Sequence, residues 1–162
     1  IVDPIDGTTN FLNGVPHFCI SIALLFEKEI IAGVIYDPIK DELFYAEKNG
    51  GSYLNNKSIR VSKKNNISDC LYGVNFRKNL PENLIIRNTG SAALDLAYVS
   101  CGRFDVCLEK NVNLWDIAAG TVLIKEAGGV VDNFEFKEFN KISIKASNER
   151  ISGALNKKIN IF

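Results

Sequence analysis

Two aspartates three residues apart, Asp3 and Asp6, are the side chains of this chain best suited to chemistry. Pro4 follows the first of them, and because proline lacks an N–H and restricts its neighbour, we expect the strand containing residues 1–2 to end there. A rigid turn of this kind can bring both carboxylates and the Ile5 carbonyl around one point. Two carboxylates about 4 Å apart repel by roughly 4 kcal/mol at an effective dielectric of 20, so the pair needs a proton or a cation. Oxygen ligands with no neighbouring histidine or cysteine favour Mg²⁺.

The residues after Asp6 extend the pattern. Gly7, Thr8 and Thr9 are expected to open a helix, whose free amides and dipole suit a phosphate group. Carboxylates for Mg²⁺ beside amides for phosphate would make a phosphoryl-transfer site. The alternative for a bare Asp-Pro-x-Asp-Gly is a pair of ordinary turns.

Composition indicates a globular chain with no strong electrostatic preference. The 162 residues are 46 % hydrophobic, and 19 basic residues balance 19 acidic ones. We therefore expect no attraction to nucleic acid or to an anionic membrane. The apolar runs are strand-sized, far below the roughly 20 residues of a membrane span, and no signal peptide is visible. The four cysteines are scattered among apolar residues, which predicts reduced core positions in a cytoplasmic protein.

The first part of the chain predicts an antiparallel meander. Apolar and β-branched runs alternate with turn residues, which predicts strands over residues 18–26, 30–36, 42–47, 52–54 and 59–61. The only histidine, His17, is interpreted as structural. The polar segment 62–69 divides a half at 1–61 from a half at 62–162.

The second part alternates strands with helices, which predicts an α/β half. Ser91 is a candidate cap and Gly102 a candidate stop for one of its helices. We expect strands over 71–76, 105–109, 130–131 and 142–146, helices over 91–101, 117–127 and 148–158, and an irregular stretch over 77–88. The fold class is therefore a layered α/β arrangement.

A third acidic residue, Asp116, stands at the start of the helix predicted over 117–127. Taken alone, it could simply cap that helix, a role worth about 1 kcal/mol. The small residues Ala118, Ala119 and Gly120 follow it. They would let the helix pack closely against the sheet and hold the carboxylate in place.

Several stretches resemble one known family. Residues 3–11, Asp-Pro-Ile-Asp-Gly-Thr-Thr-Asn-Phe, resemble the metal-binding motif of the inositol monophosphatase family. Residues 115–120, Trp-Asp-Ile-Ala-Ala-Gly, with 126–129 behind them, resemble its second motif, and 89–96 resemble its substrate-side loop and helix. The similarity is greatest to the bacterial inositol-1-monophosphatase or extragenic suppressor type. It implies the sugar-phosphatase fold of this family, with an antiparallel half followed by an α/β half.

The resemblance also implies an activity, the Mg²⁺-dependent hydrolysis of a phosphate monoester such as myo-inositol monophosphate by an activated water. Two or three Mg²⁺ ions would be bound. Asp3 would bridge two of them, the Ile5 carbonyl would bind the first, and Asp6 and Asp116 would hold the second.

Other positions are implied to bind the substrate. The amides of Gly7 and Thr8 would bind phosphate oxygens, and the Thr8 hydroxyl would orient the water. Ser91 and Ala92 would lie near the inositol hydroxyls, and Glu109 would bind the substrate ring. A solvent-exposed glutamate beside a lysine is the alternative at Glu109.

Some family features are not found in these residues. The chain has no methionine, so we expect a fragment of a longer protein. The family's N-terminal helices and the upstream glutamate pair that completes the first metal site are absent, and residues 75–88 look short for the family. We therefore expect much-reduced or absent activity from this chain alone.

Alternatives remain open. Related phosphatases of the superfamily act on 3′-phosphoadenosine phosphate, fructose 1,6-bisphosphate or histidinol phosphate. A non-catalytic binding module in transcription or ribosome biogenesis is the alternative from another class, and a decayed gene fragment is a third. The resemblance also implies a homodimer.

Overall fold

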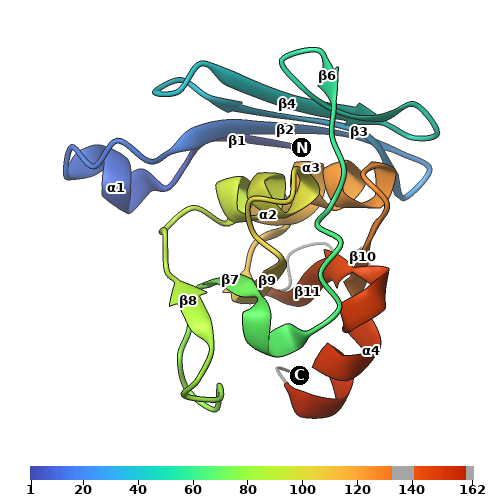
Figure 1. Cartoon of the computed structure of the whole chain (residues 1–162). Helices are drawn as coiled ribbons and strands as arrows, with labels where there is room; N and C mark the ends of the chain where they lie inside the picture. The colour runs from blue at the N-terminus through green and yellow to red at the C-terminus, as the bar shows by residue number, and fades with distance from the viewer. Residues whose placement is uncertain (133–140, 160–162) are drawn as a thin grey trace.

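The computed structural model describes residues 1–132 and 141–159. Two β-sheets enclose a pair of helices, and a further helix covers the far side of the second sheet (Figure 1). This layered α/β architecture confirms the predicted fold class. No helix among the described residues is long and apolar enough to cross a membrane.

The first sheet is a six-stranded antiparallel meander in the order β1-β2-β3-β4-β5-β6. The meander was predicted, but the position of its last strand was not. The expected strand over 59–61 is not formed, because the chain leaves the sheet after residue 58 and the Val61 N–H donates to the Ala127 carbonyl. The strands are β1 (Val2–Asp6), β2 (Cys19–Phe26), β3 (Glu29–Asp37), β4 (Glu42–Glu47), β5 (Gly51–Leu54) and β6 (Lys57–Ser58).

Strand β2 shows how this sheet presents two different faces. Alternate residues point to opposite sides of a strand, and Cys19, Ser21 and Ala23 are buried against the helices. The residues between them point outward, and the resulting outer sheet face is apolar but exposed: Val2, Ile20, Ile22, Leu24 and Phe26 are 39–59 % exposed.

The second sheet is mixed, in the order β10-β11-β9-β7-β8. β7 runs parallel to β8 and β9, while β11 is antiparallel to β9 and β10. β8 corrects the prediction of an irregular stretch over 77–88. The residues between β7 and β8 contain no helix, although parallel crossovers usually do. The strands are β7 (Leu71–Val74), β8 (Ile85–Arg87), β9 (Val106–Val112), β10 (Gly129–Asp132) and β11 (Ile142–Asn148), with a 3₁₀ turn at Ile67–Asp69.

Two helices fill the space between the sheets, α2 (Ala92–Ser100) and α3 (Leu114–Glu126). Their side chains form one apolar core with the inner face of the first sheet and one face of the second. The expected small-residue contact is present, because a Cβ added at Gly33 of β3 would come within 2.8 Å of the Ala119 Cα. α4 (Glu149–Lys158) covers the other face of the second sheet through Ile151 and Leu155.

Helix α3 begins three residues before the predicted start, at Leu114, because Asn113 is its N-cap. The helix expected over 91–101 is confirmed, and the Ser91 side chain accepts from the Leu94 N–H as its cap. The cysteines are free thiols, three of them buried. The division at residues 61 and 62 stays a prediction about domains.

Candidate active site

Three carboxylates converge where the first sheet meets helix α3. One oxygen from each of Asp3, Asp6 and Asp116 lies within 4.8 Å of the others. The first two come from β1 and the third from the first turn of α3, more than 100 residues later. Residues that the sequence placed in two separate motifs therefore belong to one cluster.

A β-bulge in strand β1 explains how two aspartates three residues apart share a face. In a regular strand, residues i and i+3 point to opposite sides. Here Asp3 pairs with Ser21 and Asp6 with Cys19, so three steps on β1 match two on β2. Since a bulge adds one residue to one strand, it resets the alternation, and both carboxylates face inward. The strand thus continues to Asp6, which corrects the prediction that it ends at Asp3; Pro4 is tolerated because β1 is an edge strand.

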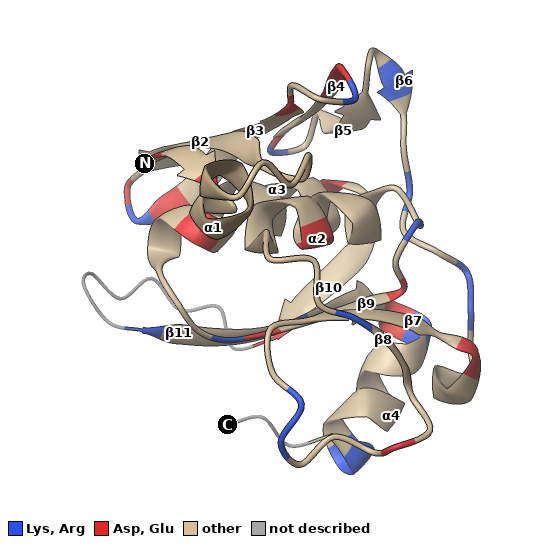
Figure 2. Cartoon of the chain, turned by 90° about the vertical axis from the view of Figure 1, so that its left-hand side faces the viewer, with Lys and Arg blue, Asp and Glu red and all other residues tan. Residues whose placement is uncertain are grey.

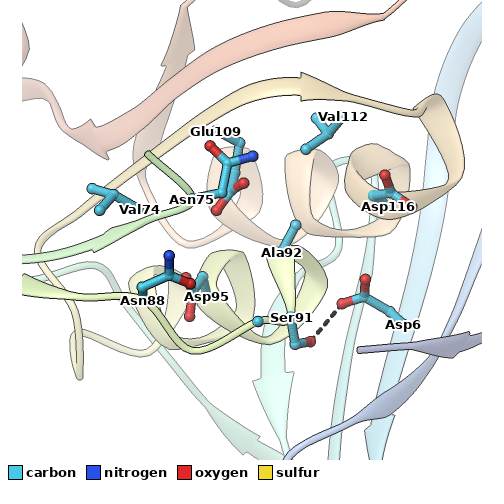
Figure 3. Close-up of a pocket in the computed structure, with 11 residues that line it drawn as sticks. Asp6, Val74, Asn75, Asn88, Ser91, Ala92, Asp95, Glu109, Val112 and Asp116 are labelled. Carbon is cyan, nitrogen blue, oxygen red and sulfur yellow. Dashed lines mark hydrogen bonds between the residues drawn. The ribbon is translucent and has the colours of Figure 1, made fainter. Parts of the chain in front are cut away.

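Asp6 is the most enclosed of the three, at 7 % exposure. Its Oδ2 accepts from the Ser91 hydroxyl at 2.5 Å and from the Ala93 N–H at 2.9 Å, so the first turn of α2 holds it (Figure 3). Burial raises the pKa of Asp6 to about 6, against the opposing effect of these hydrogen bonds, and the charges of Asp116 and Asp3 raise it further. Negative charge is therefore concentrated at this cluster, and the charge of Lys141 partly opposes it at Asp116.

Asp116 is both a helix-capping residue and a member of the cluster. Its Oδ2 accepts from the Asn113 backbone N–H at 2.7 Å and from the Asn113 amide at 3.2 Å, a capping-box geometry. No described residue donates to its Oδ1. Burial is the largest effect raising the pKa of this carboxyl, and the Asp3 charge adds to it. The capping role and a ligand role are compatible, because the capping hydrogen bonds leave Oδ1 available.

A pocket of about 210 Å³ opens beside the cluster (Figure 3). Ser91, Ala92 and Glu109 were predicted as substrate residues, and all three line it together with Asp6 and Asp116. The remaining lining residues come from the end of β7 and the residue after it, from the segment before α2, from α2 itself and from β9: Val74, Asn75, Asn88, Gly90, Asp95 and Val112.

Glu109 is 2 % exposed, which excludes the alternative of a solvent-exposed surface glutamate. Its side chain lies in β9, in the middle of the second sheet, and faces the pocket. Burial raises the pKa of Glu109 to about 9, and the charges of Asp95 and Asp6 contribute. At neutral pH this carboxyl keeps its proton, so it can donate one hydrogen bond and accept others.

Asp95 was missed by the sequence reasoning. It lies on α2, is 2 % exposed, and accepts from the Thr89 hydroxyl at 2.7 Å. Burial raises its pKa to about 7, with a contribution from the Asp6 charge. A charged residue inside an otherwise apolar helix was the available signal. In Figure 2, acidic positions lie near α1 (Thr8–Leu12) and on α2, and the basic positions in view include those on β6 and β11.

Gly7 and Thr8, the predicted phosphate-binding residues, are not among the residues that line the pocket. Gly7 has φ +86° and precedes α1 (Thr8–Leu12), the short helix expected after the first motif. The Thr8 hydroxyl donates to the Ile5 carbonyl at 2.8 Å. By helix geometry the first amides of α1 have no partner within the helix. His17, predicted to be structural, packs edge-on against Tyr98.

Comparison with known proteins places the chain among relatives of one kind. The chain is 44 % identical to an inositol-1-monophosphatase of Rhizobium meliloti, covering 98 % of this chain and 66 % of the relative. It is 41 % identical to a Nus factor SuhB of Xylella fastidiosa, covering 83 % of this chain and 54 % of that protein. The crystal structure of extragenic suppressor protein SuhB from Bartonella henselae matches with a TM-score of 0.90 and 45 % identity, covering 98 % of this chain and 70 % of that one.

The chain thus spans 54–66 % of the length of these curated relatives. The alignment with the Rhizobium protein runs over 176 positions, more than the 162 residues of this chain, so that relative has residues inside the aligned span that are lacking here. The sequence profile of the inositol monophosphatase family matches residues 1–160, and the chain belongs to that family.

Proposed function

We propose that this chain carries the catalytic core of a Mg²⁺-dependent phosphatase whose substrate is a phosphate monoester, in the first place myo-inositol monophosphate, cleaved to inositol and phosphate. The observation that carries the proposal is the convergence of Asp3, Asp6 and Asp116 at the edge of a pocket that also contains Glu109. The family membership and the inositol-1-monophosphatase name of the Rhizobium relative support the same reaction.

The donor set fits a hard cation. Three carboxylates whose oxygens lie within 4.8 Å repel one another unless a cation or protons intervene. Their ligands are all oxygen, which Mg²⁺ prefers over softer metals. Asp3, Asp6 and Asp116 would hold two or three ions with the help of the Ile5 carbonyl. When bound, such ions neutralise phosphate charge, activate a water and stabilise the leaving oxygen.

The chain's own residues would position the reacting groups. Ser91 and Ala93 hold Asp6, and Asn113 holds Asp116, so each carboxylate keeps a fixed direction before a ligand arrives. Preorganisation of this kind lowers the reorganisation needed during reaction. The amides of Gly7 and Thr8 would bind phosphate oxygens, and the Thr8 hydroxyl, now on the Ile5 carbonyl, would orient the attacking water.

The alcohol part of the substrate would occupy the pocket. Its volume of about 210 Å³ suits a small polyol. Glu109, protonated at neutral pH, can donate to one hydroxyl and accept from another, which matches the paired donors and acceptors of a polyol ring. Ala92 and Ser91 would lie against the same ring.

The test is phosphate release from inositol 1-phosphate, with fructose 1,6-bisphosphate, 3′-phosphoadenosine phosphate and histidinol phosphate as competitors. The chain, Asp116→Asn and the control Asp41→Asn are compared with and without Mg²⁺. Asp41 is an exposed turn residue at φ +53°, a conformation that asparagine also tolerates. Any release should depend on Mg²⁺ and be equal in the chain and the control, and we expect none from Asp116→Asn. The expectation of much-reduced or absent activity from the 162-residue chain stays a prediction, so Mg²⁺ binding is measured in parallel by calorimetry. A chain that neither binds Mg²⁺ nor releases phosphate contradicts the proposal.

A non-catalytic role is the second candidate, because the Xylella relative is named a Nus factor. In that case, partner binding in transcription or ribosome biogenesis would survive Asp6→Asn. Formation of a homodimer remains a proposal drawn from the resemblance, and residence in the cytoplasm remains one drawn from the scattered cysteines.

A further inference from the structure

The Ser91 hydroxyl points at a carboxylate instead of into the pocket. Its oxygen lies 2.5 Å from Asp6 Oδ2, and the residue is 2 % exposed (Figure 3). A residue that recognised substrate hydroxyls through its own hydroxyl would present that group to the open pocket. Ser91 borders the pocket, yet its polar atom is already bonded.

The direction of this hydrogen bond follows from a second contact of the hydroxyl, whose oxygen also lies 3.8 Å from the Cys19 sulfur. The Leu94 N–H donates to the Ser91 oxygen at 3.3 Å as the cap of α2. A hydroxyl has one hydrogen and two lone pairs. With a backbone donor on one lone pair, the hydroxyl hydrogen is free to point at Asp6, which as a carboxylate can only accept. Helix capping and carboxylate binding thus reinforce each other.

The Thr89 hydroxyl makes the same pair of contacts, with a backbone N–H and with a buried aspartate. Thr89 accepts from the Ser91 N–H at 3.3 Å and donates to Asp95 at 2.7 Å. The Thr89 carbonyl in turn accepts from the Asn10 amide at 2.9 Å, which joins this segment to α1. The segment that carries Ser91 is therefore fixed from both sides, so its hydroxyl has little freedom to turn away from Asp6.

The hydrogen bonds to Asp6 are all made to one oxygen. The Ser91 hydroxyl and the Ala93 N–H both bond to Oδ2, and the nearest sulfur, Cys19 Sγ, lies 3.9 Å from the same atom. No described residue donates to Oδ1. The first turn of α2 thus occupies one side of the carboxylate and leaves the other for a cation.

We propose that Ser91 is a positioning residue that orients Asp6 as a cation ligand, and that its hydroxyl does not bind the substrate. This inference rests on the proposed cation site. Residues that orient a metal ligand through a hydrogen bond typically contribute 10–100-fold to metal affinity.

The competing explanation is that Ser91 only caps α2. Threonine and glycine are about equally good N-cap residues, and both are slightly poorer than serine. Ser91→Thr keeps a hydroxyl and Ser91→Gly removes it, while the two variants should cap α2 about equally well. Asn148→Gly is the control for cap loss elsewhere, because Asn148 caps α4 far from the carboxylates.

The experiment is calorimetric titration of the whole chain and each variant, first with Mg²⁺ alone and then with inositol 1-phosphate, alongside urea unfolding in EDTA. We expect Ser91→Gly to weaken Mg²⁺ binding by about 10-fold or more. Ser91→Thr should remain within a few-fold of wild type, and Asn148→Gly should bind Mg²⁺ as wild type does.

Two results overturn the inference. Mg²⁺ affinity of Ser91→Gly equal to that of Ser91→Thr shows that only capping matters. A variant that loses inositol 1-phosphate affinity with unchanged Mg²⁺ affinity shows direct substrate binding. Wild-type chain that fails to bind Mg²⁺ is a separate outcome, which overturns the proposed cation site itself and this inference with it.

Discussion

Gly120 of α3 packs directly on Leu96 of α2, so that a Cβ added at position 120 would come within 2.5 Å of the Leu96 Cβ. Real Cβ atoms do not approach so closely, and the Leu96 Cβ is fixed to its own backbone. Because residue 120 has no side chain, α2 and α3 can pack as closely as they do. Since Asp116 lies one turn before Gly120, this contact also sets the position of one carboxylate of the cluster.

Replacement of Gly120 by alanine should destabilise the chain. Overpacking of a tight core costs about 1–3 kcal/mol, which outweighs the gain of up to about 1 kcal/mol from the better helix propensity of alanine. Urea unfolding measures the difference. Gly153→Ala in α4 is the matched control, because a Cβ there meets nothing within 4 Å, and it should stabilise by up to about 1 kcal/mol. Equal stabilisation by both variants would refute the packing argument.

The stability of the metal-free chain should fall as pH rises. Burial raises the pKa of Glu109 to about 9 and that of Asp95 to about 7. Above about pH 4.5 the unfolded chain releases protons that the folded chain keeps, so the unfolded state binds fewer protons and the free energy of unfolding decreases with pH. The decrease should extend from about pH 5 to about pH 9.

Urea unfolding in EDTA between pH 5 and 9 tests this prediction. Glu109→Gln removes one of the groups with a raised pKa, so its stability should depend less on pH, most clearly above pH 7. Glu82→Gln, an exposed loop substitution, is the control and should follow wild type. A wild-type chain whose stability rises over this range contradicts the assignment of raised pKa values.

The carboxylate of Glu126 should stabilise the turn between β4 and β5. It accepts from the backbone N–H of Asn49 at 2.9 Å and from that of Gly51 at 3.0 Å, and both turn residues have positive φ. Glu126→Ala leaves two amides without this acceptor, and we expect a loss of about 1–2 kcal/mol in urea unfolding, since the site is partly solvated. Glu47→Ala, at an exposed position of β4, should change stability by less than about 0.5 kcal/mol. Similar values for the two variants would argue against a role for the Glu126 contacts.

The outer sheet face should promote self-association of this chain. Ile22 and Leu24 are 45 % and 56 % exposed at the centre of that face, and contiguous exposed apolar surface is a common cause of association. Sedimentation velocity over a concentration series should show larger species for wild type and fewer for the double variant Ile22→Lys with Leu24→Lys. The double variant Ile39→Lys with Ile85→Lys changes exposed apolar residues outside this face and should behave as wild type. If the double variant Ile22→Lys with Leu24→Lys associates as wild type does, the association occurs through another surface.

Local patterns predicted most of the elements, because they depend on neighbouring residues. The cap at Ser91, the strands of the meander and the helix after Gly7 follow from short-range preferences. Strand β8 was missed because its three residues are stabilised by parallel pairing with β7, a contact that no local pattern encodes.

The site was predicted less completely, for the same physical reason. The convergence of Asp3 and Asp6 was expected, but it arises from a bulge, and a bulge is defined by the register of β1 against β2. The burial of Glu109 and Asp95 depends on which layers cover β9 and α2. Sequence spacing does not contain that information.

The carboxylate cluster also has a consequence for the order of events during protein synthesis. Asp6 leaves the ribosome 110 residues before Asp116, an interval of roughly 5–20 s at usual elongation rates. Through that time β1 has no α3 to pack on, and the third carboxylate is missing. The cation site is therefore completed only after the start of α3 has been synthesised.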